Sequence, residues 1–384
     1  MAGSGKRGMK NCCVIGPVKS GTTLMISLLD SHPQLSLFPL EVKFLTHWFE
    51  SLSYRPTTYE DLTSFFLERS KIRLMNGELG VERDIMNSGR IDFSGFDFRQ
   101  FHNLIRSQSE SIKFNNHAGD DLFVKFYKDV HAALDLSISR ETANWIVSKE
   151  GNHGAKHIRD IQNILPSTKF IVLCRDPRDI YASYKAISLR KAEGLRSPTF
   201  KLYVSACSYV HDNKGKNITA YEDVFSHYVE NTDFLFVHYE RLVSQVSEEM
   251  HRVANFLGIE FDEVLTQPTN LGNPWGGNAS ELMRFDGVKQ ERVSKWHSDL
   301  TGSEIQLLEY FFFRYLSQCD YECKRERIKQ RQVIGSVLVT EGNALRDYMR
   351  SATFMAITKR LVKTIFLSIR SVVCTIWAPE KLGR

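Results

Sequence analysis

The feature that most constrains this chain is a short glycine-containing loop between a buried strand and a helix. Residues 12–15 form an apolar run that stops at Gly16, and the next seven residues read Pro-Val-Lys-Ser-Gly-Thr-Thr. A helix is predicted over residues 22–29, because its leucines recur at helical spacing. A tight turn between a strand and a helix points backbone N–H groups and the positive helix end at one place. The sequence therefore predicts a phosphate-binding loop.

Other apolar runs predict the rest of a sheet and the helices around it. Further strands are predicted at residues 121–128, 169–174 and 234–237, and helices at 157–165, 243–257 and 303–317. The aromatic-rich region 46–120 is expected to be irregular or helical material that covers a site. Strands that alternate with helices indicate an α/β fold with a central parallel sheet flanked by helices.

Composition and charge exclude several classes of protein. The 384 residues are 42% hydrophobic and 25% charged, which is typical of a globular chain and excludes a largely disordered one. The net charge of +5 is too small for a protein that coats nucleic acid, although a local cluster could still bind a small anion.

Cysteine usage predicts the compartment. The seven cysteines are scattered and form neither a disulfide framework nor a zinc-binding pattern. We therefore expect a reducing compartment and no zinc site. The apolar run near the N-terminus is too short for an anchor, so we expect a cytoplasmic location.

The C-terminal part has a different character from the rest. A charged run at residues 324–331 predicts a boundary between a catalytic domain, residues 10–322, and a basic helical extension, residues 323–384. Segment 354–377 has apolar residues at helical spacing among four Lys and Arg residues. It is either a helix packed on its own domain or a helix that contacts a membrane surface or a partner.

The position of the loop lysine separates this chain from ordinary nucleotide kinases. A Walker A loop has lysine directly after its second glycine. Here Thr22 follows Gly21, and the lysine, Lys19, lies two residues before Gly21. The loop instead resembles the phosphosulfate-binding loop of sulfotransferases, whose usual form is Pro-Lys-Ser-Gly-Thr-Thr and which use 3′-phosphoadenosine-5′-phosphosulfate (PAPS). Here Val18 is inserted after the proline. The resemblance implies that the donor phosphosulfate is bound by Lys19, Ser20, Gly21, Thr22 and Thr23.

A second segment resembles another motif of the same family. Residues 170–183 read Phe-Ile-Val-Leu-Cys-Arg-Asp-Pro-Arg-Asp-Ile-Tyr-Ala-Ser, which is similar to the 3′-phosphate motif of sulfotransferases. An arginine at the carboxyl end of a parallel strand projects into the ligand crevice of an α/β fold. The resemblance implies that Arg175 and Ser183 bind the 3′-phosphate, and that the fold is the P-loop NTPase-like fold of sulfotransferases.

Three further segments resemble motifs of the same family, and those around Glu41 and Gly277 resemble its carbohydrate and bacterial branch. His-Pro at residues 32–33 and then Glu41, 22 residues after Lys19, imply that Glu41 is the general base. Lys149 matches a lysine that would neutralise charge in the transition state, although Glu150 and Gly151 after it depart from the pattern. A Trp-Gly-Gly-Asn-Ala-Ser segment implies that Gly277 and Asn278 donate hydrogen bonds to the cofactor.

Together these segments predict a sulfotransferase that moves the sulfuryl group from PAPS to an acceptor hydroxyl. The other product would be 3′,5′-adenosine bisphosphate (PAP), and the chemistry would need no metal. A carbohydrate or glycolipid acceptor is favoured over a phenol, and a small alcohol or amine is an option. Two alternatives stay open: a P-loop kinase-like phosphotransferase, and a non-catalytic protein of the nucleotide-binding fold that binds a membrane or a partner.

Overall fold

A computed structural model describes eleven stretches of the chain. They are residues 9–38, 43–50, 58–69, 96–111, 120–137, 143–194, 205–211, 213–275, 277, 287–323 and 330–349. The chain divides into two compact units. The first comprises Met1–Gly16, Gly21–Leu173 and Glu230–Gln290, and the second comprises Pro17–Ser20, Cys174–Val229 and Glu291–Arg384.

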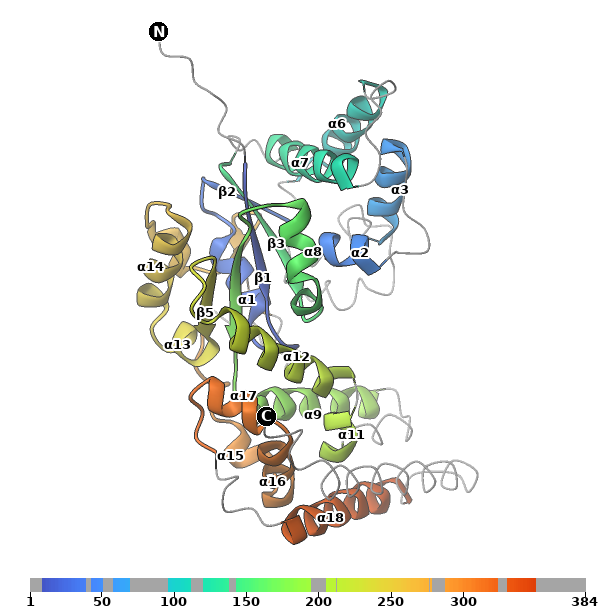
Figure 1. Cartoon of the computed structure of the whole chain (residues 1–384), viewed down its shortest axis with the longest axis vertical. Coiled ribbons are helices and arrows are strands. Elements are labelled where there is room, and N and C mark those ends of the chain that lie inside the picture. The colour runs from blue at the N-terminus through green and yellow to red at the C-terminus, as the bar shows by residue number, and fades with distance from the viewer. Residues whose placement is uncertain are drawn as a thin grey trace. The chain divides into compact units, whose positions relative to one another are not determined.

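A five-stranded sheet forms the centre of the first unit (Figure 1). Its strands are β1 (Lys10–Ile15), β2 (Leu35–Leu37), β3 (Trp145–Gly151), β4 (Lys169–Cys174) and β5 (Phe234–His238). They lie in the order β2-β3-β1-β4-β5, and β1 pairs in parallel with both β3 and β4. In β1 every residue except Lys10 is buried, as expected for a strand covered on both faces. The predicted α/β fold with a central parallel sheet is confirmed.

Helices and one hairpin surround this sheet within the first unit. They are α1 (Thr22–Leu29), α2 (Phe44–Glu50), α3 (Tyr59–Arg69), α6 (Phe98–Ser111), α7 (Asp120–Ser137), η1 (Gly154–His157), α8 (Ile158–Ile164), α13 (Tyr239–Ser244), α14 (Val246–Leu257), η3 (Glu263–Thr266) and the hairpin of β6 (Thr269–Asn270) and β7 (Asn273–Pro274). Apolar residues of α1 and α14 form a core with β1, β3 and β4. Aromatic side chains of α2, α3 and α7 form a second packed cluster, in which Phe44 stacks on Phe123 with ring centroids 5.0 Å apart.

Helices build the second unit. They are α9 (Pro177–Gly194), α11 (Ala206–His211), α12 (Asn213–Tyr228), α15 (Trp296–Asp299), α16 (Gly302–Phe311), α17 (Phe313–Gln318) and α18 (Gln330–Met349). Large buried rings hold them together: Tyr181 of α9 contacts Tyr209 of α11, and Phe225 of α12 contacts Tyr315 of α17.

One strand prediction is wrong. Residues 121–128 lie inside α7 and not in the sheet. Over the full length of α7, apolar residues recur three and four positions apart. They are buried on one side of the helix and include Leu122, Phe126 and Val130. The sequence did not predict β3, which pairs with β1, or β2, which pairs with β3.

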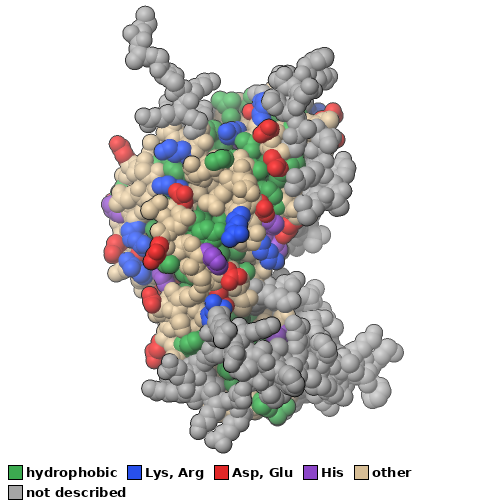
Figure 2. Space-filling model, in the orientation of Figure 1, with side chains coloured by type: hydrophobic (Ala, Val, Ile, Leu, Met, Phe, Trp, Pro, Cys, Tyr) green, Lys and Arg blue, Asp and Glu red, His purple; other side chains and the backbone are tan. Residues whose placement is uncertain are grey.

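The other predicted elements lie close to their expected places, but two predicted helices are split. The predicted helix at 243–257 is two helices, α13 and α14, that meet at Gln245. The predicted helix at 303–317 is likewise two helices, α16 and α17, that meet at Phe312. The described parts of region 46–120 are helical except at residues 58, 96 and 97. Segment 354–377 lies outside the described residues, and the boundary at 322/323 stays a prediction. Within the described part of the chain, no helix is both long enough and apolar enough to cross a membrane. Figure 2 shows acidic and basic side chains interspersed over the described surface of one face.

Candidate functional site

The loop after β1 has a backbone that few residues adopt. Lys19 has a φ of 69° and Gly21 a φ of 99°, so both are in the left-handed region. For lysine this conformation costs free energy, and such strain is concentrated at functional sites. At Gly21 no larger residue fits, because a Cβ atom there would lie 2.5 Å from Cδ2 of Tyr239. The packing against Tyr239 therefore requires glycine at this position of the loop.

In the first unit, the loop's C-terminal half meets Lys149. Thr22 and Thr23 open α1, and Gly21 at its N-cap provides no side chain to bond the first N–H groups of the helix. Lys149 lies on β3 opposite Val14 of β1. Its Nζ donates a hydrogen bond of 2.8 Å to Oγ1 of Thr23. A cation predicted from the sequence is thus brought beside the start of α1, where anions bind favourably.

In the second unit, the loop's N-terminal half meets Arg175. Arg175 directly follows β4 and is 5% exposed. Its Nη1 donates to the backbone oxygen of Lys19 at 2.8 Å, and its Nη2 donates to the backbone oxygen of Arg292 at 2.9 Å. Arg175 N also donates to the hydroxyl of Tyr315 at 3.3 Å. The two motifs that the sequence singled out are therefore joined through Lys19 and Arg175.

Ser20 gives independent information on what the loop binds. Its side chain is fully buried, and its Oγ makes no hydrogen bond within the described part of the chain. A buried hydroxyl without a partner is costly, so a polar partner from outside the protein would stabilise it. Phosphate oxygens are acceptors of the required kind.

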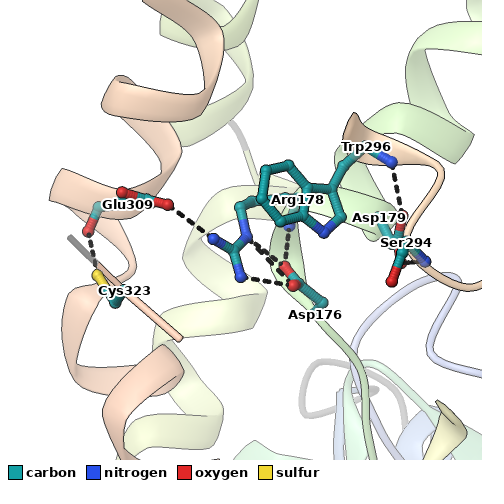
Figure 3. A network of polar contacts seen from close by, with 7 residues as sticks. All are labelled: Asp176, Arg178, Asp179, Ser294, Trp296, Glu309 and Cys323. Carbon is teal, nitrogen blue, oxygen red and sulfur yellow. Dashed lines mark hydrogen bonds and ion pairs between the residues drawn. The ribbon is translucent and has the colours of Figure 1, made fainter. Parts of the chain in front are cut away.

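The motif after β4 continues into the first turn of α9. Asp176 Oδ1 accepts a hydrogen bond of 2.8 Å from Arg178 N, which satisfies a free N–H group at the helix start. Pro177 occupies the first helical position, where its missing N–H is not needed. Arg178 is buried between Asp176 and Glu309, with ion pairs of 2.7 and 2.6 Å (Figure 3). Ser183 lies further along α9 and is half-buried.

Sequence reasoning missed Glu150, which it treated only as a departure from the family pattern. This carboxylate is completely buried on β3. Its Oε2 accepts from Thr46 N at 2.8 Å and its Oε1 accepts from Leu45 N at 3.3 Å, so it binds the first turn of α2. Burial raises the pKa of Glu150. The available signal was weak: Glu150 follows a short apolar run, Trp-Ile-Val at residues 145–147, but Ser148 and Lys149 lie between them.

A small cavity lies beside Lys149 and Glu150 in the first unit. Its volume is about 20 Å³, room for about one water molecule. Aromatic rings of Phe38, Phe44 and Tyr127 form much of its wall. Lys149 and Glu150 therefore line the same small cavity as these aromatic rings.

Of the three remaining predicted site residues, the structure describes one, Gly277. Gly277 is buried with a φ of 84°, just after the buried Trp275. Glu41 and Asn278 lie outside the described residues. Among the residues that the structure describes, no group of three His, Cys, Asp or Glu side chains could hold a metal ion.

Comparisons with known proteins agree with the motifs. The family model described as "Sulfotransferase family" matches residues 12–263. Protein-tyrosine sulfotransferase 2 of Gallus gallus is 29% identical over 154 residues, which are 38% of this chain and 38% of that protein. This chain therefore matches well under two thirds of that relative's length.

Solved structures of low identity were also matched. The sulfotransferase domain from the curacin biosynthetic pathway is 18% identical, with 83% of this chain and 100% of that chain covered and a TM-score of 0.46. Sulfotransferase STF9 from Mycobacterium avium is 11% identical, with 82% and 78% covered and a TM-score of 0.39. Because the family model matches well over half of the residues and includes both the loop and Arg175, the chain belongs to the sulfotransferase family.

Proposed function

We propose that this protein transfers a sulfuryl group from PAPS to an acceptor hydroxyl and releases PAP. The observation that carries this proposal is the hydrogen bond from Arg175 to the backbone oxygen of Lys19. It joins the segment that resembles the 5′-phosphosulfate loop to the segment that resembles the 3′-phosphate motif. A donor with phosphates at both positions needs both segments together.

The proposed donor site uses residues whose chemistry suits phosphate and sulfate. The phosphosulfate would be bound by Lys19, Ser20, Gly21, Thr22 and Thr23, and the 3′-phosphate by Arg175 and Ser183. Gly277 and Asn278 would add hydrogen-bond donors. The buried hydroxyl of Ser20 supports this assignment, as does the start of α1, which no side chain caps. Arginine has five N–H donors, so it can bind backbone carbonyls and a phosphate at once.

The protein's own groups would move one proton and neutralise charge. PAPS supplies the activated sulfuryl group. We propose that Glu41 accepts the proton of the acceptor hydroxyl, while Lys19 and Lys149 stabilise the negative charge that grows on the leaving phosphate. The contact between Lys149 and Thr23 supports this role, because it places the ammonium group at the loop. Lysines and N–H groups can supply this charge without a metal ion.

For the acceptor, we propose a carbohydrate or glycolipid hydroxyl, with a small alcohol or amine as the wider class. Glu41 and the segment around Gly277 support the carbohydrate class through their resemblance to that branch. Membrane-surface contact through residues 354–377 would suit a glycolipid. A cytoplasmic location belongs to the same proposal, and the free thiols of the described cysteines are consistent with it.

Calorimetric titration with PAP, ATP and ADP tests the donor. We expect PAP to bind with micromolar affinity, Arg175→Ala to abolish this binding, and ATP and ADP to bind far more weakly. Preference for ATP or ADP would overturn the proposal in favour of a phosphotransferase. No binding of any of the three would favour the non-catalytic alternative.

Glu41→Gln then tests the chemical step. We expect this variant to bind PAP like the wild type and to lose sulfuryl transfer to a sugar or glycolipid acceptor. Full transfer activity in this variant would exclude Glu41 as the base.

A further inference from the structure

A turn late in the chain helps to orient Arg175. Residues 291–295 of the second unit form this turn, and α15 follows at Trp296. The backbone oxygen of Arg292 accepts the hydrogen bond from Arg175 Nη2. The turn therefore supplies one carbonyl group that binds the guanidinium, and Lys19 supplies another. If the turn moved, Arg175 would lose the hydrogen bond to Arg292.

Asp179 holds the backbone of the turn. It lies in the first turn of α9, and its side chain points at the start of α15 (Figure 3). Its Oδ2 accepts from Ser294 N at 2.8 Å and its Oδ1 accepts from Trp296 N at 2.9 Å. Both carboxylate oxygens are thus used on N–H groups two residues apart, on either side of Lys295.

The turn needs this support because its backbone is strained. Ser294 has a φ of 60°, which serine rarely adopts. The bond from Ser294 N to Asp179 offsets that cost at the strained residue itself. Without the carboxylate, the strained conformation would lose the bond that favours it.

A second contact holds the side chain that follows the turn. The guanidinium carbon of Arg178 lies 4.0 Å from the ring centroid of Trp296, a cation–π contact. Arg178 is itself fixed by Asp176 and Glu309 (Figure 3). Two adjacent residues of α9 therefore stabilise this segment. Asp179 binds backbone N–H groups of Ser294 and Trp296, and Arg178 contacts the aromatic ring of Trp296.

From these contacts we propose that Asp179 is a positioning residue for the 3′-phosphate, because it holds the turn whose Arg292 carbonyl orients Arg175. This inference rests on the proposed function, in which Arg175 binds that phosphate. In this proposal Asp179 acts through the turn, because both of its oxygens bind N–H groups there. The effect of Asp179 is specific to the 3′-phosphate of the donor. Removing its carboxylate should therefore weaken binding of the 3′-phosphate and leave binding of the rest of the nucleotide unchanged.

The charge state of Asp179 sets the conditions of the test. Burial raises its pKa to about 6, and the proximity of Asp176 acts in the same direction. The N–H groups of Trp296 and Ser294 and the charge of Arg175 oppose this rise. The carboxylate is ionised at pH 7.5, where it accepts both hydrogen bonds, so the measurement is made there.

The test compares two ligands that differ in the 3′-phosphate. Dissociation constants for PAP and for adenosine 5′-monophosphate are measured by calorimetry in the full-length protein, with millimolar ligand for the weaker one. We expect Asp179→Asn to weaken PAP binding by about tenfold, the scale of one lost charged hydrogen bond, and to change adenosine monophosphate binding little. A matched control is Asp262→Asn, since Asp262 also accepts a backbone N–H, from Val264 at 3.0 Å, but in the first unit. This control should bind both ligands as the wild type does.

Each outcome decides between distinct claims. Unchanged PAP binding in Asp179→Asn, or an equal loss for both ligands, would overturn the positioning role. Unchanged PAP binding in Arg175→Ala would instead overturn the proposed function. Where thermal denaturation shows Asp179→Asn to be unfolded, Asp179→Glu keeps the charge but displaces it, and the same selective loss of PAP affinity is expected.

Discussion

Nζ of Lys149 lies 2.8 Å from Oγ1 of Thr23, although 126 residues separate them in the chain. The contact follows from the sheet, because β3 pairs directly with β1, the strand that leads into the loop. The carboxyl ends of two neighbouring parallel strands thereby deliver a cation and the start of a helix to one place.

Replacing Lys149 tests whether this cation acts in the reaction. Lys149→Met keeps much of the side-chain length and removes the charge. We expect kcat for sulfuryl transfer to fall by about 10²-fold or more, the typical loss when one charge-stabilising donor is removed. The dissociation constant of PAP should change much less. The control is Lys156→Met on η1, whose side chain is exposed. A kcat equal to that of the control would exclude a catalytic role for Lys149.

Gly21 provides a test of the loop geometry. Gly21→Ala would place Cβ 2.5 Å from Tyr239 Cδ2 and would require alanine at a φ of 99°. We expect the free energy of unfolding to fall by about 1–3 kcal/mol, since both the clash and the backbone conformation are unfavourable. Chemical denaturation measures this loss, and PAP titration measures the accompanying loss of affinity.

The matched control separates the two causes. Gly258 also has a positive φ, of 67°, but a Cβ there would meet no atom within 4 Å. Gly258→Ala should therefore lose only the backbone contribution and should bind PAP normally. Equal stability losses in the two variants would mean that the contact with Tyr239 is unimportant.

Local signals explain which parts of the fold could be predicted. Local residues mark the ends of the strands and helices at two places, residues 12–23 and residues 169–183. In both, an apolar run is followed by a glycine or proline and then by a helix. Residues 121–128 were misleading because eight residues rich in apolar and aromatic side chains suit either a strand or a helix. Only the full stretch of α7 shows the helical spacing of its buried residues.

Strand β3 could not be predicted from its own residues. It contains Ser148, Lys149 and Glu150, which give it no continuous apolar run. Partners from distant segments make burial of Ser148 and Glu150 possible. Ser148 contacts Cys13 at 3.4 Å, and Glu150 binds the first turn of α2. The same long-range contacts explain why the support given by Glu150 and Asp179 was not visible in the sequence.

Glu150 should matter for stability through its bonds to α2. Glu150→Gln replaces one accepting oxygen by an NH₂ group that faces a backbone N–H. We expect the free energy of unfolding to fall by about 1–3 kcal/mol, the cost of leaving a buried donor unsatisfied. The control is Glu248→Gln, since the Glu248 side chain is 61% exposed. Denaturant unfolding curves that coincide for the wild type and Glu150→Gln would contradict this role.

The buried carboxyl group of Glu222 should make the free energy of unfolding depend on pH. It lies on α12, and burial raises its pKa to about 7, whereas the ordinary value is 4.5. Between these two pH values the folded protein binds more protons than the unfolded chain, so its free energy of unfolding falls as pH rises. The contribution of one such group cannot exceed about 1.4 kcal/mol per pH unit. The stabilisation is present below pH 4.5 and is lost as pH passes through 7.

Because many groups titrate in this range, the informative quantity is the difference between the wild type and Glu222→Gln. Glutamine keeps the shape of the protonated acid and does not titrate. Urea unfolding at pH 4.5, 6 and 7.5 should show the wild type losing stability relative to Glu222→Gln as pH rises. A difference that stays constant across these three pH values would mean that Glu222 titrates at the same pH in the folded and unfolded protein, contrary to its burial.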